Sequence, residues 1–446
     1  MIWIELLILL AMILAGSQMK GIGLGVTGML GMVIFVFIFH MRPADPPVDV
    51  MLIILAIVTT AATLQAAGGL DYLVGIAERI IRSNPSRITF IAPVTVYFLC
   101  LFAGTSHVVY SLLPVIADVA AKKRIRPERP LSISVVASHV ALTGSPMSAA
   151  TAALATIMLY NRAALDIMMI CIPCCLLGVL AGAFSVRKMG KELNDDPDFQ
   201  ERMREHYFRE WMEAPLADMQ VRGDKKAKTA VIIFGITIAL VVCCGAFPGL
   251  LPRFEAGRAG FAVNADGSIK MNALIAMITL SAAALMMWVT RTRPVQVAQA
   301  SLFTAMGVAV VAIFGVVWMS ATFMQHNEAA IRLALGDVVQ AHPWTFAFAV
   351  FAMGVLMFSQ AATTRAMMPL GMTLGMSHPA LIAVFPAVNA DFVLPGYPTL
   401  LAAIQFDRTG TTRIGKMLLN HSFMRPGLVT LTVAIALAFF LGSILL

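Results

Sequence analysis

The feature that most constrains this chain is a series of apolar segments long enough to cross a lipid bilayer. Segments 51–64, 131–160, 167–186 and 229–251 contain no Asp, Glu, Lys or Arg. They approach or exceed the roughly 20 apolar residues that span the hydrocarbon core as a helix. The whole chain is 59% hydrophobic and 13% charged, whereas soluble domains carry about 25% charged residues. The sequence therefore predicts an all-α polytopic membrane protein.

Composition and motifs argue against several other classes of function. The net charge of +8 is typical of the basic loops of membrane proteins and does not indicate nucleic-acid binding. All six cysteines lie inside apolar segments with no second cluster of Cys or His, so we expect neither a metal site nor a disulfide. The chain lacks the Walker motif of ATP-driven pumps and the H-E-x-x-H and G-x-S-x-G motifs of hydrolases. We therefore expect no enzymatic activity and no cofactor other than a coupling ion.

The apolar segments predict about ten transmembrane helices, with two apolar pairs and two interrupted helices among them. Their expected bounds are 2–16, 23–39, 48–67, the pair 88–103 and 107–121, 131–159, 167–186, 229–251, 271–290, 298–324, the pair 344–358 and 363–377, 379–405 and 424–445. Loops on one side, one of which holds Arg79, then carry most of the 32 basic residues. Loops on the other side, one of which holds Arg332, carry few. The positive-inside rule therefore predicts that both termini are periplasmic.

The order of these segments predicts two repeats. The first is 1–186, with a hairpin at 88–121 and a broken helix at 131–159, and the second is 229–446, with a hairpin at 344–377 and a broken helix at 379–405. A cytoplasmic connector at 187–228 joins the two repeats. Because each repeat crosses the membrane an odd number of times, their topologies are inverted. Inverted repeats with paired broken helices are typical of secondary transporters.

Each apolar pair begins and ends on the same side of the membrane. The arms are short, and their tips are polar: Gly104-Thr105-Ser106-His107 and Ser359-Gln360-Ala361-Ala362-Thr363-Thr364. Non-helical backbone at membrane depth is tolerated where it lines a cavity inside the protein, so we interpret the pairs as re-entrant hairpins. Two full spans for each pair are the alternative.

The two tips and two breaks are expected to meet near the midplane and bind the substrate. Half-helix N-termini attract anions, and carbonyls released at a break can coordinate Na⁺. The candidate substrate-binding residues are Thr105, Ser106, His107, Thr143, Ser145, Ser148, Ser359, Gln360, Thr363, Thr364, Arg365, Asn389, Asp391, Tyr397 and Thr399. Most are neutral donors suited to carboxylate oxygens. Ser and Thr in membrane helices can instead bond back to their own backbone.

Three of these candidates are ionisable. Arg365 follows the second tip at membrane depth, where a cation is costly and often functional. It either binds a substrate carboxylate or pairs with Asp391. Asp391 is a candidate proton or cation ligand, and His107 is a candidate titrating group. His139 is interpreted as a packing residue.

Several sequence strings resemble the anaerobic C4-dicarboxylate transporter (Dcu) family. They are Gly21-Ile22-Gly23-Leu24-Gly25, Pro46-Pro47-Val48-Asp49-Val50-Met51, Ala62-Thr63-Leu64-Gln65-Ala66, Gly68-Gly69-Leu70-Asp71, His107-Val108-Val109-Tyr110, Ile125-Arg126-Pro127-Glu128-Arg129-Pro130, the run from Ala402 to Thr412 and Asn420-His421-Ser422-Phe423. The chain departs from the family pattern around Phe358 and around Asn389-Ala390-Asp391-Phe392. Both departures lie in the expected substrate site, so the class of substrate follows from the resemblance but the individual substrate does not.

The resemblance implies a multi-pass protein of the bacterial inner membrane that carries fumarate, succinate, malate and aspartate. It also implies an ion-transporter-like architecture, a homodimer in which a hairpin-bearing domain moves against a dimerising scaffold. We therefore expect secondary transport by antiport or exchange through an elevator-type mechanism, with the dicarboxylate and the lipid bilayer as partners. The alternative is a Na⁺- or H⁺-coupled importer of another organic anion or of an amino acid.

Overall fold

The computed structural model describes residues 2–19, 22–46, 48–158, 160, 162–214, 225–247, 251–255, 262–263, 267–357, 359–394, 397–414 and 420–446. Within these ranges the regular structure is helical, apart from isolated bridges between Val263 and Ile269 and between Ile414 and His421. The chain is therefore all-α over the part that is described, as the apolar segments predict.

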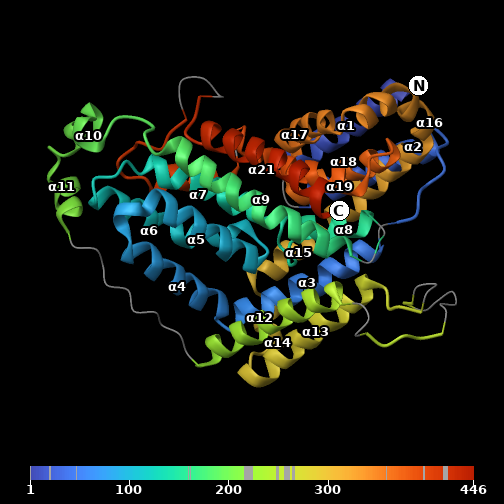
Figure 1. The fold of residues 1–446 in the computed structure, drawn as a ribbon, viewed down its shortest axis with the longest axis horizontal. Coiled ribbons are helices and arrows are strands. Elements are labelled where there is room, and N and C mark those ends of the chain that lie inside the picture. Colours follow the sequence, from blue (N-terminus) through green and yellow to red (C-terminus); the bar gives the residue numbers. More distant parts are fainter. Residues whose placement is uncertain are drawn as a thin grey trace.

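The first half of the chain forms nine α-helices. They are α1 (Ile2–Met19), α2 (Gly23–Phe37), α3 (Val48–Ala66), α4 (Gly69–Ser83), α5 (Ile88–Ala103), α6 (Val109–Lys122), α7 (Glu128–Val140), α8 (Ala149–Ile157) and α9 (Ala163–Val186). Short helices α10 (Pro197–Arg202) and α11 (His206–Glu213) follow in the connector, of which residues 215–224 lie outside the described ranges. Figure 1 shows α10 and α11 at the end of the molecule opposite the N-terminus.

The second half follows a similar order. Its helices are α12 (Lys225–Ala246), α13 (Met271–Thr290), α14 (Pro294–Ala298), α15 (Ser301–Ala312), α16 (Trp318–Ala341), α17 (Phe346–Met357), α18 (Gln360–Thr373), α19 (His378–Val384), α20 (Pro398–Phe406) and α21 (Met424–Leu445). A π-helical turn at Ile313–Val317 joins α15 to α16, and a 3₁₀ segment at Phe385–Phe392 follows α19.

Four helical stretches of the described chain are long and apolar enough to cross a membrane by themselves. They are Pro85–Ala103, Ala163–Val186, Ala273–Thr290 and Met424–Leu445. Shorter apolar helices cover Ile2–Ile13, Gly25–Phe37, Leu55–Ala66 and Pro343–Val355. Several expected spans are divided here into shorter pieces, because the chain bends or breaks within them.

Two expected loops are helical in the structure. The stretch with Arg79 forms α4, and the stretch with Arg332 belongs to α16. Helix α4 is amphipathic: Leu70, Ala77 and Ile81 are buried at helical spacing, while Arg79 is exposed. A window that averages hydropathy misses such a helix, because only one of its faces is apolar.

The described chain departs from the α-helix within both segments expected to be interrupted helices. Helix α7 continues as a 3₁₀ turn, Ala141–Thr143, and α8 resumes after Gly144-Ser145-Pro146. In the second half the 3₁₀ segment ends at Phe392 and α20 begins at Pro398; Pro395 and Gly396 of this break lie outside the described residues. We call residues 141–148 the first break and residues 385–397 the second break.

Both apolar pairs are helix–turn–helix units. At the first tip Gly104 ends α5 in the left-handed region, with φ of 68°, a conformation that glycine adopts without steric cost. At the second tip Ser359 caps α18, and residue 358 lies outside the described residues. Residues 104–108 are called the first tip below, and residues 359–365 the second tip.

Helices α9 and α21 lie side by side along the centre of the molecule (Figure 1). Gly178 and Gly182 of α9 allow this close approach: a Cβ atom at Gly178 would lie 2.6 Å from the Thr430 carbonyl oxygen, and one at Gly182 would lie 2.3 Å from the Thr430 hydroxyl oxygen. Small residues four apart are a common device for packing membrane helices, since lipid supplies no hydrophobic force between them.

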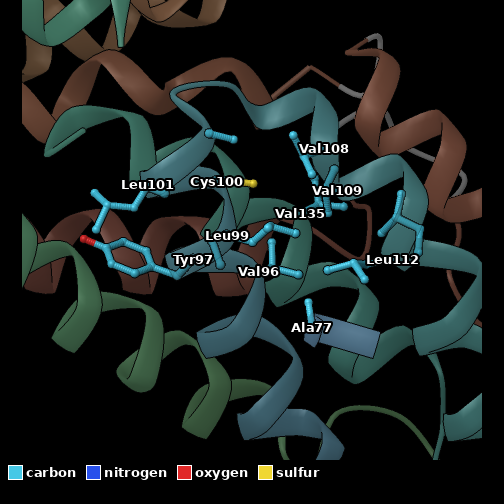
Figure 2. Packing of buried hydrophobic residues seen from close by; sticks show 14 of the residues in the cluster. Ala77, Val96, Tyr97, Leu99, Cys100, Leu101, Val108, Val109, Leu112 and Val135 are labelled. Carbon is cyan, nitrogen blue, oxygen red and sulfur yellow. The ribbon is translucent and has the colours of Figure 1, made fainter. Parts of the chain in front are cut away.

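The first hairpin packs against α7 through an apolar core. Val96 and Leu99 of α5, Val109 and Leu112 of α6 and Val135 of α7 are buried in one cluster (Figure 2). Because α7 leads into the first break, this core holds the first tip in a defined position beside that break.

The remaining long helices pair across the two halves. Helix α3 packs on α13, while α2 packs on α16 and on the π-helical turn. The second contact is very close, since a Cβ atom at Gly28 would lie 2.6 Å from the Gly315 carbonyl carbon. In each half, the third long helix therefore packs on the second long helix of the other half.

We expect Gly178→Ala to destabilise the protein, because the added methyl group would overlap the Thr430 carbonyl in the α9–α21 contact. Overpacking of this kind costs about 1–3 kcal/mol. Gly235→Ala is the matched control, since a Cβ at this exposed helical position meets nothing within 4 Å. Thermal unfolding of the purified variants in detergent measures the effect. Equal melting temperatures for the two variants would contradict the proposed role of this contact.

Candidate functional site

The first tip is joined to the first break. The Ser145 hydroxyl donates a hydrogen bond to the Leu101 carbonyl oxygen at 2.6 Å. A Cβ atom at Gly104 would lie 2.6 Å from the Met147 carbonyl oxygen, so the backbones of tip and break are in contact. The first break therefore satisfies a carbonyl at the end of α5, while the Thr151 hydroxyl lies within hydrogen-bonding distance of the carbonyl oxygens of Leu142 and Thr143 in the break itself.

The second tip is joined to the second break in a similar way. The Gln360 side-chain amide, at the start of α18, donates a hydrogen bond to Asp391 Oδ2 at 2.7 Å. A Cβ atom at Gly354 of α17 would lie 3.2 Å from the Val388 carbonyl oxygen. Each hairpin of the chain thus packs its polar end against the break of its own half.

His139 connects the two breaks. Its Nδ1 atom lies 2.9 Å from Asp391 Oδ1, and its Nε2 atom lies 2.8 Å from the Thr399 hydroxyl oxygen. All three residues are at most 1% exposed. The interpretation of His139 as a packing residue is therefore wrong. Its only sequence signal is a polar side chain just before a break, because its partners lie more than 250 positions away.

Two further residues, Asn389 and Tyr397, complete the connection between the breaks. The Asn389 amide donates hydrogen bonds to the Thr143 hydroxyl oxygen at 2.7 Å and to the Pro386 carbonyl at 2.8 Å. The Tyr397 ring lies edge-on to the His139 ring, with 4.7 Å between centroids, and its hydroxyl is within hydrogen-bonding reach of Ser106. Both breaks and both tips therefore meet around His139 and Asp391. We call His139, Gln360, Asp391 and Thr399 the central network.

Several predicted hydroxyl groups hold local backbone in this conformation. Thr105, Ser148 and Ser359 accept hydrogen bonds from backbone N–H groups at the starts of helical segments. The Thr363 and Thr364 hydroxyls donate to the carbonyl oxygens four residues earlier. For Ser and Thr residues, hydrogen bonds to nearby backbone were the alternative to substrate binding, and these contacts are of that kind.

His107 differs from the buried position expected for a binding residue. It is exposed, and its ring stacks on that of Tyr110 with 6.0 Å between centroids. Its neighbour Ser106 is buried. Ser106, rather than His107, is thus the residue of this pair that reaches Tyr397.

Arg365 is buried and has no anionic partner within the part of the chain that the structure describes. Its side chain is on α18, which packs on α8, α16 and the π-helical turn, and the residue is only 3% exposed. Its Nε and Nη2 atoms have no hydrogen-bond partner among the described residues. The two oxygens of Asp391 instead accept hydrogen bonds within the central network. The structure thus shows no Arg365–Asp391 ion pair, and two guanidinium donors are available to an anion.

A cluster of charged residues holds the N-terminal end of α7. Arg126 contacts Glu128 and Asp196, each at 2.6 Å, and the Ser422 hydroxyl donates to Glu128 at 2.6 Å. Burial alone would raise the pKa of Asp196, but the hydrogen bond from Arg126 outweighs it and holds the pKa below its usual range. This cluster ties the connector and the segment before α21 to the helix that carries His139.

None of these groups resembles a metal centre. Among the described residues, no three His, Cys, Asp or Glu side chains gather in a way that could hold a metal ion. The chemistry available at the centre is therefore hydrogen bonding by neutral donors, one buried guanidinium group and one His–Asp pair.

We expect Gln360→Met to lower the melting temperature, because Asp391 Oδ2 would lose its donor while remaining buried. Such a loss costs about 1–3 kcal/mol. Gln360→Glu should destabilise more at about pH 8 than at about pH 5, since only a protonated Glu can donate to Asp391. Thermal unfolding at the two pH values measures both effects, with the exposed Gln299→Met as control. A Gln360→Glu variant with the same stability at both values would contradict the contact.

Comparison with known proteins identifies the family of this chain. The family model described as "Anaerobic c4-dicarboxylate membrane transporter" matches residues 1–446. The chain is 38% identical to the anaerobic C4-dicarboxylate transporter DcuB of Escherichia coli O6:H1, covering 97% of this chain and 96% of that protein. It is also 38% identical to the C4-dicarboxylate transporter DcuA of Wolinella succinogenes, with both chains fully covered.

A solved structure supports the fold alone. The YdaH transporter of Alcanivorax borkumensis aligns with a TM-score of 0.50 at 16% identity, covering 99% of this chain and 98% of that chain. The full-length family match and the two relatives confirm the resemblance predicted from the sequence strings. They describe membrane transporters rather than enzymes, and the apolar helices agree with a multi-pass membrane protein. This chain belongs to the anaerobic C4-dicarboxylate membrane transporter family.

Proposed function

We propose that this protein is a secondary transporter of C4-dicarboxylates such as fumarate, succinate, malate and aspartate, which it exchanges across the bacterial inner membrane. The relatives named for this substrate class cover the chain from end to end. The contacts between tips and breaks support the proposal, because broken helices at the centre of a transporter present backbone and side-chain donors to a small ion.

The single observation that carries the substrate class is the buried guanidinium group of Arg365. A cation inside a membrane protein is expensive unless it is paired. With no anionic partner for Nε and Nη2 in the described part of the chain, a substrate carboxylate is the partner that we propose. Arginine suits this task because its planar donors match the two oxygens of a carboxylate. The second carboxylate would bind other neutral donors where the tips and breaks meet.

We further propose that the two halves are inverted repeats. Each contains a hairpin followed by a broken helix and one long helix, namely α5–α9 in the first half and α17–α21 in the second. The reciprocal packing of α3 on α13 and of α2 on α16 also supports this proposal. An inverted pair predicts that both termini are periplasmic and that the connector is cytoplasmic.

The packing also supports an elevator-type mechanism. The hairpins, the breaks, α9 and α21 form one packed body around the central network, whereas α1–α3, α12, α13, α15 and α16 pack mainly with one another. In the mechanism we propose, the first body carries the substrate between the two sides while the second is the scaffold. Large apolar side chains exposed on α12 and α13, such as Ile236 and Trp288, suit contacts with lipid or with the scaffold of a second copy.

Exchange in proteoliposomes tests the proposed function. Purified protein is reconstituted into vesicles loaded with succinate, and entry of labelled succinate, fumarate or aspartate is measured with and without the internal dicarboxylate. We expect internal dicarboxylate to accelerate entry. Entry of another organic anion or of an amino acid, driven by a Na⁺ or pH gradient and not accelerated by internal dicarboxylate, would favour the coupled importer instead. Absence of any dicarboxylate flux would refute the substrate class.

We expect Arg365→Ala to raise the KM for succinate about 10- to 100-fold, since a hydrogen-bonded contact with a charged group contributes about 1.5–3 kcal/mol. Arg365→Lys should recover only part of this loss, because lysine cannot form the two-pronged contact. The exposed Arg87→Ala is the matched control and should leave KM unchanged. An unchanged KM in Arg365→Ala would assign Arg365 a purely structural role.

A further inference from the structure

The His139–Asp391 pair is the most deeply buried ionisable arrangement at the meeting point of the two breaks. The two residues come from different halves of the chain and are 1% and 0% exposed. Resting on the proposed function, we infer that His139 Nε2 is the binding site for a proton that is transported together with the dicarboxylate. Asp391 and Thr399 position the imidazole ring for this role.

The directions of the hydrogen bonds identify the atom that receives the proton. Asp391 accepts from the Gln360 amide at Oδ2 and lies against His139 Nδ1 at Oδ1. With Asp391 as a carboxylate, which only accepts hydrogen bonds, Nδ1 carries a hydrogen whether the ring is neutral or charged. In this tautomer the lone pair of the neutral ring is on Nε2, 2.8 Å from the Thr399 hydroxyl oxygen, and Thr399 is the donor of that contact.

Protonation of Nε2 reverses this last hydrogen bond. The new Nε2–H donates to the Thr399 oxygen, and the hydroxyl hydrogen of Thr399 turns away toward another acceptor. One proton is gained and no covalent bond is broken. A substrate carboxylate oxygen beside α20 would be such an acceptor, so the site offers the Thr399 hydrogen to the substrate only when His139 is protonated. This reversal links the proton to the substrate.

Charge balance in the low-dielectric interior favours the same coupling. The buried charged residues on the described tips and breaks are Arg365 and Asp391, whose charges cancel. A doubly charged dicarboxylate would leave the loaded site with an uncompensated double negative charge, which is expensive away from water. A proton on His139 removes half of that charge.

Other titratable side chains on the elements packed against the pair are less suited to this role. They are Tyr97 and Cys100 on α5, His107 at the first tip, Tyr110, Asp118 and Lys122 on α6, Asp166, Cys171, Cys174 and Cys175 on α9, Arg365 on α18, His378 on α19, Tyr397 in the second break and Arg425 on α21. Histidine is the side-chain type whose charge ordinarily changes between pH 5 and 8. Of the three histidines concerned, His107 is exposed and His378 stacks on Tyr160, so His139 is the one in the central network.

Gradient-driven uptake into substrate-free proteoliposomes tests the inference. The membrane potential is clamped at zero, a pH gradient of about one unit is applied with the acid side outside, and accumulation of labelled succinate is measured. One proton per substrate allows up to about tenfold accumulation for each pH unit. We expect this accumulation for the unmodified protein, for Thr399→Ser, which keeps the hydroxyl, and for His342→Gln, which removes an exposed histidine elsewhere. We expect no accumulation for His139→Gln or Thr399→Val.

Proton uptake on binding gives a second readout that does not require transport. Succinate is added to purified protein in weakly buffered detergent at about pH 7, and the proton stoichiometry is read with a pH dye. The unmodified protein should take up about one proton per succinate bound, and His139→Gln and Thr399→Val should take up almost none. If His139→Gln does not fold, Thr399→Val decides the question, because it keeps the His139–Asp391 pair intact.

The possible failures are distinguishable. Gradient-driven accumulation by His139→Gln or Thr399→Val equal to that of the unmodified protein would overturn the inference. Succinate exchange without any gradient-driven accumulation in the unmodified protein would also overturn it, while the proposed dicarboxylate transport would stand. Absence of both exchange and succinate binding would instead refute the proposed function.

Discussion

The structure depends on one constraint: polar groups at the centre of a membrane protein must find their hydrogen-bond partners inside the protein, because lipid provides none. Breaking a helix at mid-depth exposes such groups. Here each break is covered by the polar tip of a hairpin, through Ser145 and Leu101 in the first half and through Gln360 and Asp391 in the second. The hairpins and the breaks are therefore parts of one arrangement, and neither is stable at this depth without the other.

His139 makes this arrangement common to both halves. It bonds to Asp391 within the second break and to Thr399 at the start of α20, so α7 of the first half is tied to the second break and to the helix that follows it. A ring with two different nitrogen atoms can do this in either protonation state. His139, which stabilises the contact between the two halves, is for this reason also suited to bind a proton when an anion binds nearby.

Much of the architecture could be predicted from the sequence, because its cause is local. Apolar length indicated the membrane helices, Gly144-Ser145-Pro146 marked the first break, and polar tips marked the hairpins. Helix α4 escaped prediction, since an amphipathic helix resembles a loop when hydropathy is averaged over a window, and the end of α16 was also expected to be a loop. The candidate binding residues included three members of the central network, Gln360, Asp391 and Thr399, but not His139. The Arg365–Asp391 pair that the sequence allowed is not seen, and Asp391 contacts His139 and Gln360 instead.

The sequence by itself determined the class of the protein, its family, the order of its helices and the positions of its interruptions. These properties follow from composition, from short strings and from the conformational limits of Gly and Pro, all of which are local. Only the tertiary structure decided which polar groups meet. His139 and its partners are separated by more than 250 positions, and their contact arises from the packing of whole helices. The packing also leaves Nε and Nη2 of the buried Arg365 without a hydrogen-bond partner among the described residues, and it is this placement, rather than its presence in the chain, that makes Arg365 a candidate anion contact.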